Sequence, residues 1–305
     1  MREAVRVVIA IPTFKRPRML KRLLDAVALL ETDADVRVLV ADNDAEGHQG
    51  RDLCDLLAPS YRWPLKGVIA HQRGIAQVRN TLVAEALSDA DVDFICMIDD
   101  DEWPDPGWIA QFLNVQQQTG ADALQGSILF ETEHGGSHST PDIIGRTGPV
   151  AMLQGAGNIM LQAQRLRAMT PPWFDPAFAL TGGEDTDFFM RLKAEGARFA
   201  WVDEARAYGD VPEARETLRW MLRRAYSHGN SDMTILLKYR PGAATRLRET
   251  GKILLALLLS LPAALILAPS PNRRLLPLEK LCRAAGKLSA MFGARYREYA
   301  VIHGD

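Results

Sequence analysis

Two kinds of block alternate in the pattern of apolar and polar positions over the first 120 residues. Short apolar runs cover 5–11, 36–40 and 93–98, and runs of this length bounded by polar residues predict buried strands. Longer stretches with apolar residues three and four apart predict helices, and they cover 17–30, 74–87 and 108–119. The alternation predicts an α/β fold with a Rossmann-like, mostly parallel sheet flanked by helices on both faces.

Polar residues follow each of the three predicted strands. Thr13 comes after the first strand, Asp42 after the second and Asp99 after the third. Because ligands bind at the carboxyl ends of parallel strands, we expect these residues to share one crevice.

The third of these strands ends in three consecutive carboxylates, Asp99, Asp100 and Asp101. Adjacent carboxylates at the end of a buried strand repel one another, which favours a bound cation. Mg²⁺ or Mn²⁺ suits them, because such ions use one or two protein carboxylates and leave positions open for substrate phosphates. The alternative is a solvated acidic loop, which the apolar strand before the triplet disfavours.

A second acidic cluster occupies 184–187, directly after Gly182 and Gly183 and before a helical pattern. Glycines let the backbone approach a ligand closely, and the helix dipole favours carboxylates in a first turn. The dipole also explains acidic helix starts that have no catalytic role. Taken alone, the cluster therefore leaves both interpretations open.

Composition is ordinary for a globular chain of 305 residues, at 47% hydrophobic and 24% charged, but the charge is unevenly distributed. Residues 1–210 hold 20 Lys and Arg against 31 Asp and Glu, whereas 211–305 hold 16 against 7. The basic C-terminal third predicts an anionic partner. The three cysteines have no metal-ligand spacing, which indicates a reducing compartment, and no signal peptide is expected.

The segment 253–268 is apolar and uncharged, and its 16 residues fall just short of the ~18 to 20 that span a bilayer as a helix. Basic residues flank both ends, which favours the cytoplasmic side of a membrane for both. A re-entrant or in-plane hairpin fits these flanks better than a single crossing, and a buried core helix is the alternative. Residues 275–299 predict an amphipathic helix on anionic lipid. No nucleic-acid motif is present, so nucleic acid is not an expected partner.

Five short segments together resemble the family 2 glycosyltransferases, and most closely the bacterial exopolysaccharide enzymes of the succinoglycan glucosyltransferase type. The segments are Pro12–Pro17, Asp42–Asn43, Arg73–Asn80, Asp99–Asp101 and Gly183–Asp185. The resemblance covers about residues 5–230. It implies a GT-A fold and transfer of a sugar from a nucleotide diphosphate donor, usually a UDP-sugar, with inversion at the anomeric carbon and with Mn²⁺ or Mg²⁺ as cofactor.

The resemblance also implies a role for each matching residue. Asp185 matches the catalytic base, with Glu184 beside it, and Asp101 matches the metal ligand, with Asp99 as a second. Gly209 stands where several relatives carry Glu, so Asp210 or His228 is the candidate third ligand. The residues that it places on the nucleotide sugar are Pro12, Thr13, Arg16, Asp42, Asn43, Arg73, Gly74, Arg79, Asn80, Asp99 and Asp100.

These features predict a catalytic domain over 1–230, with a nucleotide-sugar half (1–120) and an acceptor half (121–230), and a membrane-associated helical region over 231–305. The predicted acceptor is a lipid-linked saccharide in bacterial surface polysaccharide synthesis. The predicted location is the cytoplasmic face of the inner membrane, with 253–268 peripheral or re-entrant. Two alternatives are a noncatalytic membrane scaffold and a sugar-phosphate nucleotidyltransferase, whose usual glycine-rich loop after the first strand is missing here.

Overall fold

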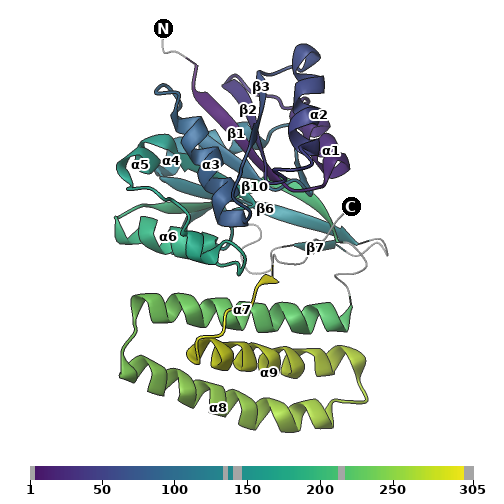
Figure 1. Ribbon diagram of the computed structural model, residues 1–305, viewed down its shortest axis with the longest axis vertical. Helices are drawn as coiled ribbons and strands as arrows, with labels where there is room; N and C mark the ends of the chain where they lie inside the picture. The colour runs from purple at the N-terminus through teal and green to yellow at the C-terminus, as the bar shows by residue number, and fades with distance from the viewer. Residues whose placement is uncertain (1–3, 133–136, 140–145, 212–216, 299–305) are drawn as a thin grey trace. The chain divides into compact units, whose positions relative to one another are not determined.

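The computed structural model describes residues 4–132, 137–139, 146–211 and 217–298 (Figure 1). Among these, one compact unit comprises 4–179 and 184–210, and a second comprises 180–183 and 211–298. The units divide after residue 210, earlier in the chain than the predicted boundary at residue 230, which falls inside a helix of the second unit.

One sheet organises the first unit, in the strand order β3-β2-β1-β4-β9-β6-β10-β5, with β7 beside β6 and β8 beside β10. The strands are β1 (Arg6–Thr13), β2 (Asp35–Asp42), β3 (Leu65–Ile69), β4 (Phe94–Ile98), β5 (Glu102–Pro104), β6 (Ala123–Thr132), β7 (Ser137–Ser139), β8 (Gly148–Val150), β9 (Asn158–Gln162) and β10 (Phe199–Val211). β1, β2, β3 and β4 pair in parallel. β9 is antiparallel to β4 and β6, and β10 to β5 and β8.

The sheet is therefore mixed, whereas the sequence predicted one that is mostly parallel. Parallel neighbours need a crossover connection, usually a helix. Helices follow β1, β2 and β3, but none lies between β6 and β9 among the residues that the structure describes. The second half of the sheet accordingly pairs antiparallel.

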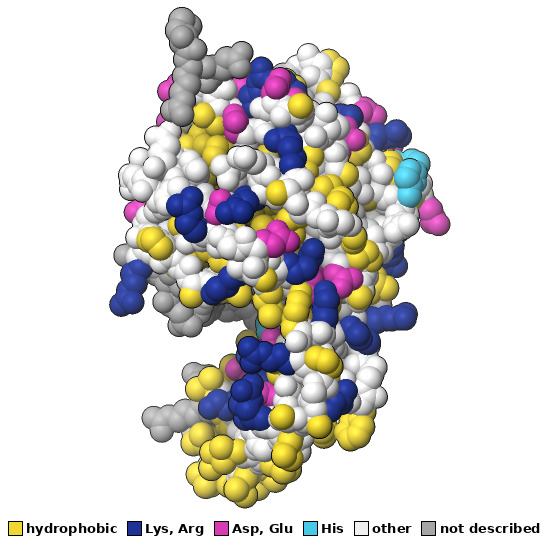
Figure 2. All heavy atoms as spheres, turned by 90° about the vertical axis from the view of Figure 1, so that its left-hand side faces the viewer, with side chains coloured by type: hydrophobic (Ala, Val, Ile, Leu, Met, Phe, Trp, Pro, Cys, Tyr) yellow, Lys and Arg dark blue, Asp and Glu magenta, His cyan; other side chains and the backbone are white. Residues whose placement is uncertain are grey.

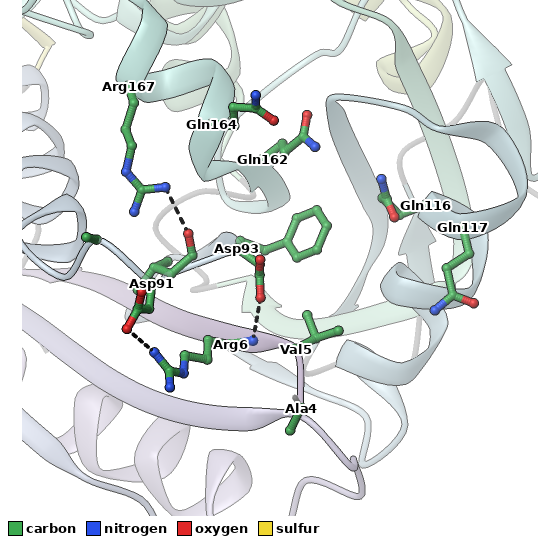
Figure 3. Close-up of a pocket in the computed structure, with 13 residues that line it drawn as sticks. Ala4, Val5, Arg6, Asp91, Asp93, Gln116, Gln117, Gln162, Gln164 and Arg167 are labelled. Atoms are coloured by element: carbon green, nitrogen blue, oxygen red, sulfur yellow. Dashed lines mark hydrogen bonds and ion pairs between the residues drawn. The ribbon is translucent and has the colours of Figure 1, made fainter. Parts of the chain in front are cut away.

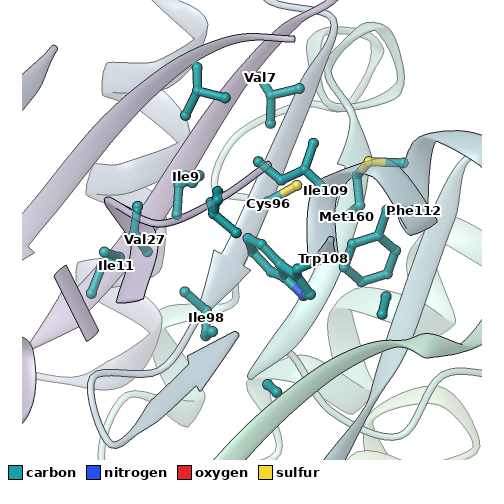
Figure 4. Close-up of a cluster of buried hydrophobic side chains, with 14 of the residues drawn as sticks. Val7, Ile9, Ile11, Val27, Cys96, Ile98, Trp108, Ile109, Phe112 and Met160 are labelled. Atoms are coloured by element: carbon teal, nitrogen blue, oxygen red, sulfur yellow. The ribbon is translucent and has the colours of Figure 1, made fainter. Parts of the chain in front are cut away.

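Helices cover both faces of this sheet (Figure 1). They are α1 (Pro17–Val27), α2 (Gln49–Leu57), α3 (Ile75–Leu87), α4 (Trp108–Thr119), α5 (Ala163–Ala168) and α6 (Glu184–Ala194), with short 3₁₀ turns at Ala58–Ser60 and Pro176–Phe178. Alternate residues of β1 face opposite sides. Val7, Ile9 and Ile11 pack in one cluster with α1 and α4 (Figure 4), while α3 packs on the same strand and on β2.

The second unit consists of α7 (Leu218–Tyr239), α8 (Ala243–Ile266) and α9 (Pro271–Met291), with α9 between the other two (Figure 1). Two glycines let α7 and α9 approach closely. A β-carbon on Gly229 would lie 2.1 Å from the carbonyl oxygen of Arg283, and one on Gly286 would lie 2.0 Å from that of Tyr226.

Residues 253–266 of the predicted re-entrant segment belong to one continuous helix, α8, which passes through Pro262 and ends at Ile266. Within the described residues, α8 is the one helix whose length and mean hydropathy of 1.7 would allow it to cross a membrane. Only 22% of its apolar stretch is buried inside the protein, so it is not a core helix.

Candidate active site

The carboxyl ends of β1, β2 and β4 bring their polar residues to one edge of the sheet, as the sequence predicted. Thr13 and Asp42 are register partners in the parallel β1–β2 pair. From β1, the Thr13 hydroxyl donates to Asp100 Oδ2 over 2.8 Å, just beyond the end of β4. Residues far apart in the chain therefore form a single polar edge.

Arg16 holds the carboxylate triplet from the turn that precedes α1. Its Nη1 lies 3.1 Å from Asp100 Oδ1 and 3.3 Å from Asp101 Oδ2. Burial, with a contribution from the neighbouring Asp101, nevertheless raises the pKa of Asp100 to about 7, although Arg16 opposes the shift. One guanidinium thus compensates the triplet only in part.

Asp42 and Asn43 shape the loops beside this edge. Asp42 is buried, and its carboxylate accepts hydrogen bonds from the backbone N–H groups of Asp44, Gly50 and Arg51, which include two in the first turn of α2. These bonds anchor the Asp42 carboxylate, and its predicted contact with the nucleotide sugar stays a prediction.

The Asn43 side chain fixes the segment that leads into α3. It donates to the carbonyls of Ala70 (3.0 Å) and Gln72 (2.7 Å) and accepts from the N–H of Gly74 (2.7 Å). Gly74 has φ 135°, and a β-carbon there would lie 2.7 Å from that of Ala179. The glycine lets the chain turn into α3 and leaves the preceding Arg73 exposed.

Arg79 of α3 connects the strand-end carboxylates to the second acidic cluster. Its guanidinium lies 3.2 Å from Asp99 Oδ1 and makes an ion pair with Glu184, in a position where 5% of its side chain is exposed. The next residue, Asn80, makes hydrogen bonds of 2.7 and 2.9 Å to the backbone of Phe174. These contacts place both residues in the framework of the site, and their predicted contact with the nucleotide stays a prediction.

Glu184 and Asp185 lie in the first turn of α6, after Gly182 and Gly183, which have φ 73° and 92°. Burial, with a contribution from Asp185, raises the pKa of Glu184 to about 8, and Arg79 opposes the shift. Asp185 is partly exposed and accepts a hydrogen bond of 2.7 Å from the N–H of Thr186. Asp185 makes no ion pair with any described residue, which leaves its carboxylate open to a substrate.

Glu102 belongs to the same carboxylate cluster and was not predicted. It is 6% exposed, and its Oε2 has no hydrogen-bond partner within the described residues. A β-carbon on Gly157 would lie 3.0 Å from Glu102 Oε1 and 3.2 Å from Asp99 Oδ2, so both carboxylates face one spot. Burial, together with Asp99 and Asp101, raises the pKa of Glu102 well above its usual value. Glu102 could have been included among the predicted site residues, because it directly follows the carboxylate triplet in the sequence.

The excess of buried carboxylate over cation fits a divalent metal ion. Glu102 has an oxygen without a hydrogen-bond partner among the described residues, and burial together with the neighbouring carboxylates raises the pKa values of Asp99, Asp100 and Glu102. In the described part of the chain, no three or more His, Cys, Asp or Glu side chains form a ready metal site. The donors present suit an ion that takes one or two protein carboxylates and completes its shell with phosphate and water.

The two candidate third ligands lie in different units. Asp210 ends the first unit and makes an ion pair with Arg22, whose guanidinium lies 3.3 Å from the centroid of the Trp103 ring. His228 is an exposed residue of α7 in the second unit. Neither candidate ligand role is tested by these contacts.

A hollow of about 730 Å³ lies at the opposite edge of the sheet, at the start of β1 and β4 (Figure 3). Its charged groups are occupied by the protein itself. Arg6 pairs with Asp91 at 2.5 Å, Asp93 accepts from the Arg6 backbone N–H, and Arg167 donates to the carbonyls of Asp89 and Val92. Since this hollow holds none of the open carboxylates, the candidate active site is the edge with Asp99, Asp101 and Asp185.

Two family models match the chain. Glycosyl transferase family 2 matches residues 8–168, and Glycosyl transferase family group 2 matches residues 94–282. The first match contains the ends of β1, β2 and β4, and the second contains Glu184 and Asp185. Both agree with the resemblance that the motifs gave.

Individual proteins that are similar to the chain agree with this family. The chain is 28% identical over 309 aligned residues to the succinoglycan biosynthesis protein ExoM of Rhizobium meliloti (strain 1021), covering 96% of this chain and 95% of ExoM. It is 25% identical to the chondroitin synthase of Pasteurella multocida (strain Pm70), over 68% of this chain and 25% of that protein. Structures of S. aureus TarS 1-349 with UDP and with UDP-GlcNAc superimpose with TM-scores of 0.54 and 0.53, at 16% identity over 96% of this chain and 93% of theirs. This likeness shows a GT-A-like fold.

Proposed function

The chain belongs to glycosyl transferase family 2 and is a glycosyltransferase, and from this premise we propose that it transfers a sugar from a UDP-sugar to a hydroxyl group of a lipid-linked saccharide. The relative ExoM carries the name of a polysaccharide biosynthesis protein, which supports a role in bacterial surface polysaccharide synthesis. The UDP and UDP-GlcNAc complexes of TarS support a UDP-sugar as the donor. The location that fits this acceptor is the cytoplasmic face of the inner membrane.

One observation carries the proposed mechanism: Asp185 is an open carboxylate beside a neighbour that is tied to the strand-end carboxylates. Glu184 reaches Arg79, and Arg79 reaches Asp99. This chain of contacts fixes the start of α6 against the end of β4. In the proposed reaction, Asp185 accepts the proton of the acceptor hydroxyl as that oxygen attacks the anomeric carbon from the side opposite the diphosphate, which inverts the configuration.

The carboxylates at the end of β4 are proposed to act on the leaving group, the diphosphate of the donor. Asp101 and Asp99 would hold Mn²⁺ or Mg²⁺, which supplies Lewis-acid stabilisation of the departing diphosphate. Arg16, which contacts Asp100 and Asp101, keeps these side chains in place. The side chains of both proposed ligands are partly exposed, 24% for Asp101 and 34% for Asp99.

The test is turnover of a panel of nucleotide sugars by the purified chain with Mn²⁺, Mg²⁺ or chelator, with and without a bacterial lipid extract. We expect metal-dependent release of UDP from one donor and an increase with the extract. Asp185→Asn is expected to bind the donor but to transfer about 10² to 10⁴ times more slowly. Asp25→Asn, an exposed carboxylate on α1, is the control and should match the parent.

Three results would count against this proposal. Equal turnover by Asp185→Asn and the parent would remove the assigned base. Release of pyrophosphate in place of UDP would favour a nucleotidyltransferase. Failure to turn over any donor, with donor binding intact, would favour a scaffold.

A further inference from the structure

The outer side of α8 is an apolar surface that no described residue covers. Leu254, Leu258, Leu261 and Leu265 recur at spacings of four, three and four, which places them on one stripe of the helix. Their exposed fractions run from 56% to 71%. Leu247, Leu255, Leu259 and Ile266 are exposed to a similar degree. We call these eight residues the leucine face.

The opposite side of α8 is engaged within the unit. Ile253 and Ser260 are buried, and Ile253 packs in a cluster with residues of α7 and α9. The buried Glu249 pairs with Lys252 at 2.6 Å and with Lys287 of α9 at 3.5 Å. α8 is thus held by one side and exposes leucine on the other, at a density that is unusual for a surface in water.

Basic side chains border the leucine face. Arg246, Arg248 and Lys252 are exposed near the start of α8, and Lys280 is exposed on α9, whereas Arg283 of α9 pairs with Asp232 of α7 and does not border the face. Figure 2 shows hydrophobic side chains gathered on the C-terminal unit, with Lys and Arg bordering them. An apolar helix face edged by cations is the pattern of a helix that lies in the surface of an anionic bilayer.

The packing of α9 argues against a crossing by α8. The two helices are antiparallel neighbours, since Arg246 donates to the carbonyl of Met291 and Lys287 reaches Glu249. A helix pair that crossed the bilayer would carry Lys280 and Arg283, in the middle of α9, toward its centre. Charges at that depth are strongly unfavourable. The pair can instead lie flat, with α8 toward the lipid and α9 behind it.

We propose that the leucine face docks this chain in the plane of an anionic membrane, as a peripheral anchor that enters one leaflet and does not cross. This proposal rests on the membrane location in the proposed function. Of the two arrangements predicted for 253–268, it favours the peripheral one over the re-entrant one. The partner is the lipid surface, chosen over a second copy of the chain because basic residues border the face, which complements anionic lipid.

The first experiment is sedimentation of the full chain with vesicles of phosphatidylcholine alone or mixed with phosphatidylglycerol. We expect strong binding only to the mixed vesicles, and weaker binding as salt is raised. Leu258→Gln with Leu265→Gln should lower the partition coefficient about tenfold per leucine, because each such side chain leaves water on docking. Leu56→Gln on α2, where the leucine is 75% exposed, is the matched control and should bind as the parent does.

Turnover of the nucleotide sugar, measured without lipid, tests the proposed function independently of membrane docking. The double leucine variant should hydrolyse or transfer from the nucleotide sugar in solution as the parent does, since these residues lie outside the first unit. Loss of vesicle binding with turnover intact supports the docking surface. Intact vesicle binding by the double variant overturns it, whatever the turnover.

Depth measurements distinguish lying flat from crossing. Leu254→Cys, Leu258→Cys and Leu265→Cys, each made alone in a Cys282→Ser background where Cys54 and Cys96 stay buried, would carry a fluorophore quenched by nitroxide lipids. Equal shallow depths at the three positions support the in-plane helix, whereas depths that increase steadily along α8 overturn it. Absence of vesicle binding, with a concentration-dependent dimer that the double variant abolishes, would assign the face to a second copy and also overturn the proposal.

Discussion

Removal of Arg79 should destabilise the first unit far more than removal of a surface arginine. Arg79 and Glu184 are 4% and 2% exposed, and Asp99 contacts the same guanidinium. Breaking a buried ion pair by removing one partner typically costs about 3 to 5 kcal/mol, because the other charge is left uncompensated. For a unit of this size we expect Arg79→Met to lower Tm by about 6 to 20 °C.

The control is Arg37→Met, whose partner Asp89 and whose own side chain are partly exposed, at 28% and 44%. An ion pair of that kind contributes about 0 to 1 kcal/mol. Adding Glu184→Gln to Arg79→Met should restore part of the loss, because it removes the unpaired charge. The free energy of unfolding is measured by urea titration followed by circular dichroism, with the slope m unchanged between variants.

The loss should also increase with pH. Burial and the nearby Asp185 together raise the pKa of Glu184 to about 8, although Arg79 opposes the shift. A carboxyl group whose pKa is higher in the folded chain keeps its proton there, so stability falls as pH rises from the unfolded value of about 4.3 toward the folded one. Without Arg79 the folded pKa is higher still, so the difference from the parent widens as pH rises through about 8, where Glu184 ionises in the folded parent but not in the folded variant.

Two results would refute this reasoning. One is a loss for Arg79→Met no greater than that for Arg37→Met. The other is a loss that stays constant, or shrinks, as the pH is raised. Either would mean that Arg79 does not compensate the buried carboxylates.

Two further predictions concern packing and acid stability. Gly229→Ala should destabilise the second unit by about 1 to 3 kcal/mol, because the added β-carbon would meet a backbone carbonyl of α9. Gly251→Ala should instead stabilise it by about 0.5 to 1 kcal/mol, because no atom lies within 4 Å of the added β-carbon. Urea titration measures the free energy of unfolding of both variants. Although burial opposes it, hydrogen bonds from Arg165 and from the backbone of Arg198 lower the pKa of Asp122, so its contribution is present above the unfolded pKa and lost as pH falls through the folded one. Asp122→Asn should therefore lower Tm at neutral pH and flatten the acid side of the Tm against pH curve.

The polar edge of the site was predictable because it depends on local signals. A β-branched run followed by polar residues marks each strand end, and the carboxyl ends of parallel strands meet. Thr13, Asp42 and Asp99 were placed together on that ground, and the helix at 108–119 was predicted with its observed bounds. The strand Leu65–Ile69 was missed, since its five residues include Lys66 and Gly67 and none of them is fully buried.

The connection through Arg79 was not predictable from the sequence. Its partner Glu184 lies 105 residues further along the chain, and nothing in the pattern of α3 distinguishes this arginine from an exposed one. The antiparallel half of the sheet was missed for a related reason. Apolar runs show that a strand forms, but the direction of its neighbour follows from the connections, and the sequence between β6 and β9 left that direction undetermined.

The short segment 180–183 has a mechanical consequence. It is grouped with the C-terminal helices, and Ser231 of α7 donates to the carbonyl of Thr181, yet the very next residues are Glu184 and Asp185. The chain therefore leaves the first unit and returns to it just before Asp185, the proposed base, through two glycines with positive φ. A change in how 180–183 pack against α7 would act on the start of α6 through these four covalently linked residues.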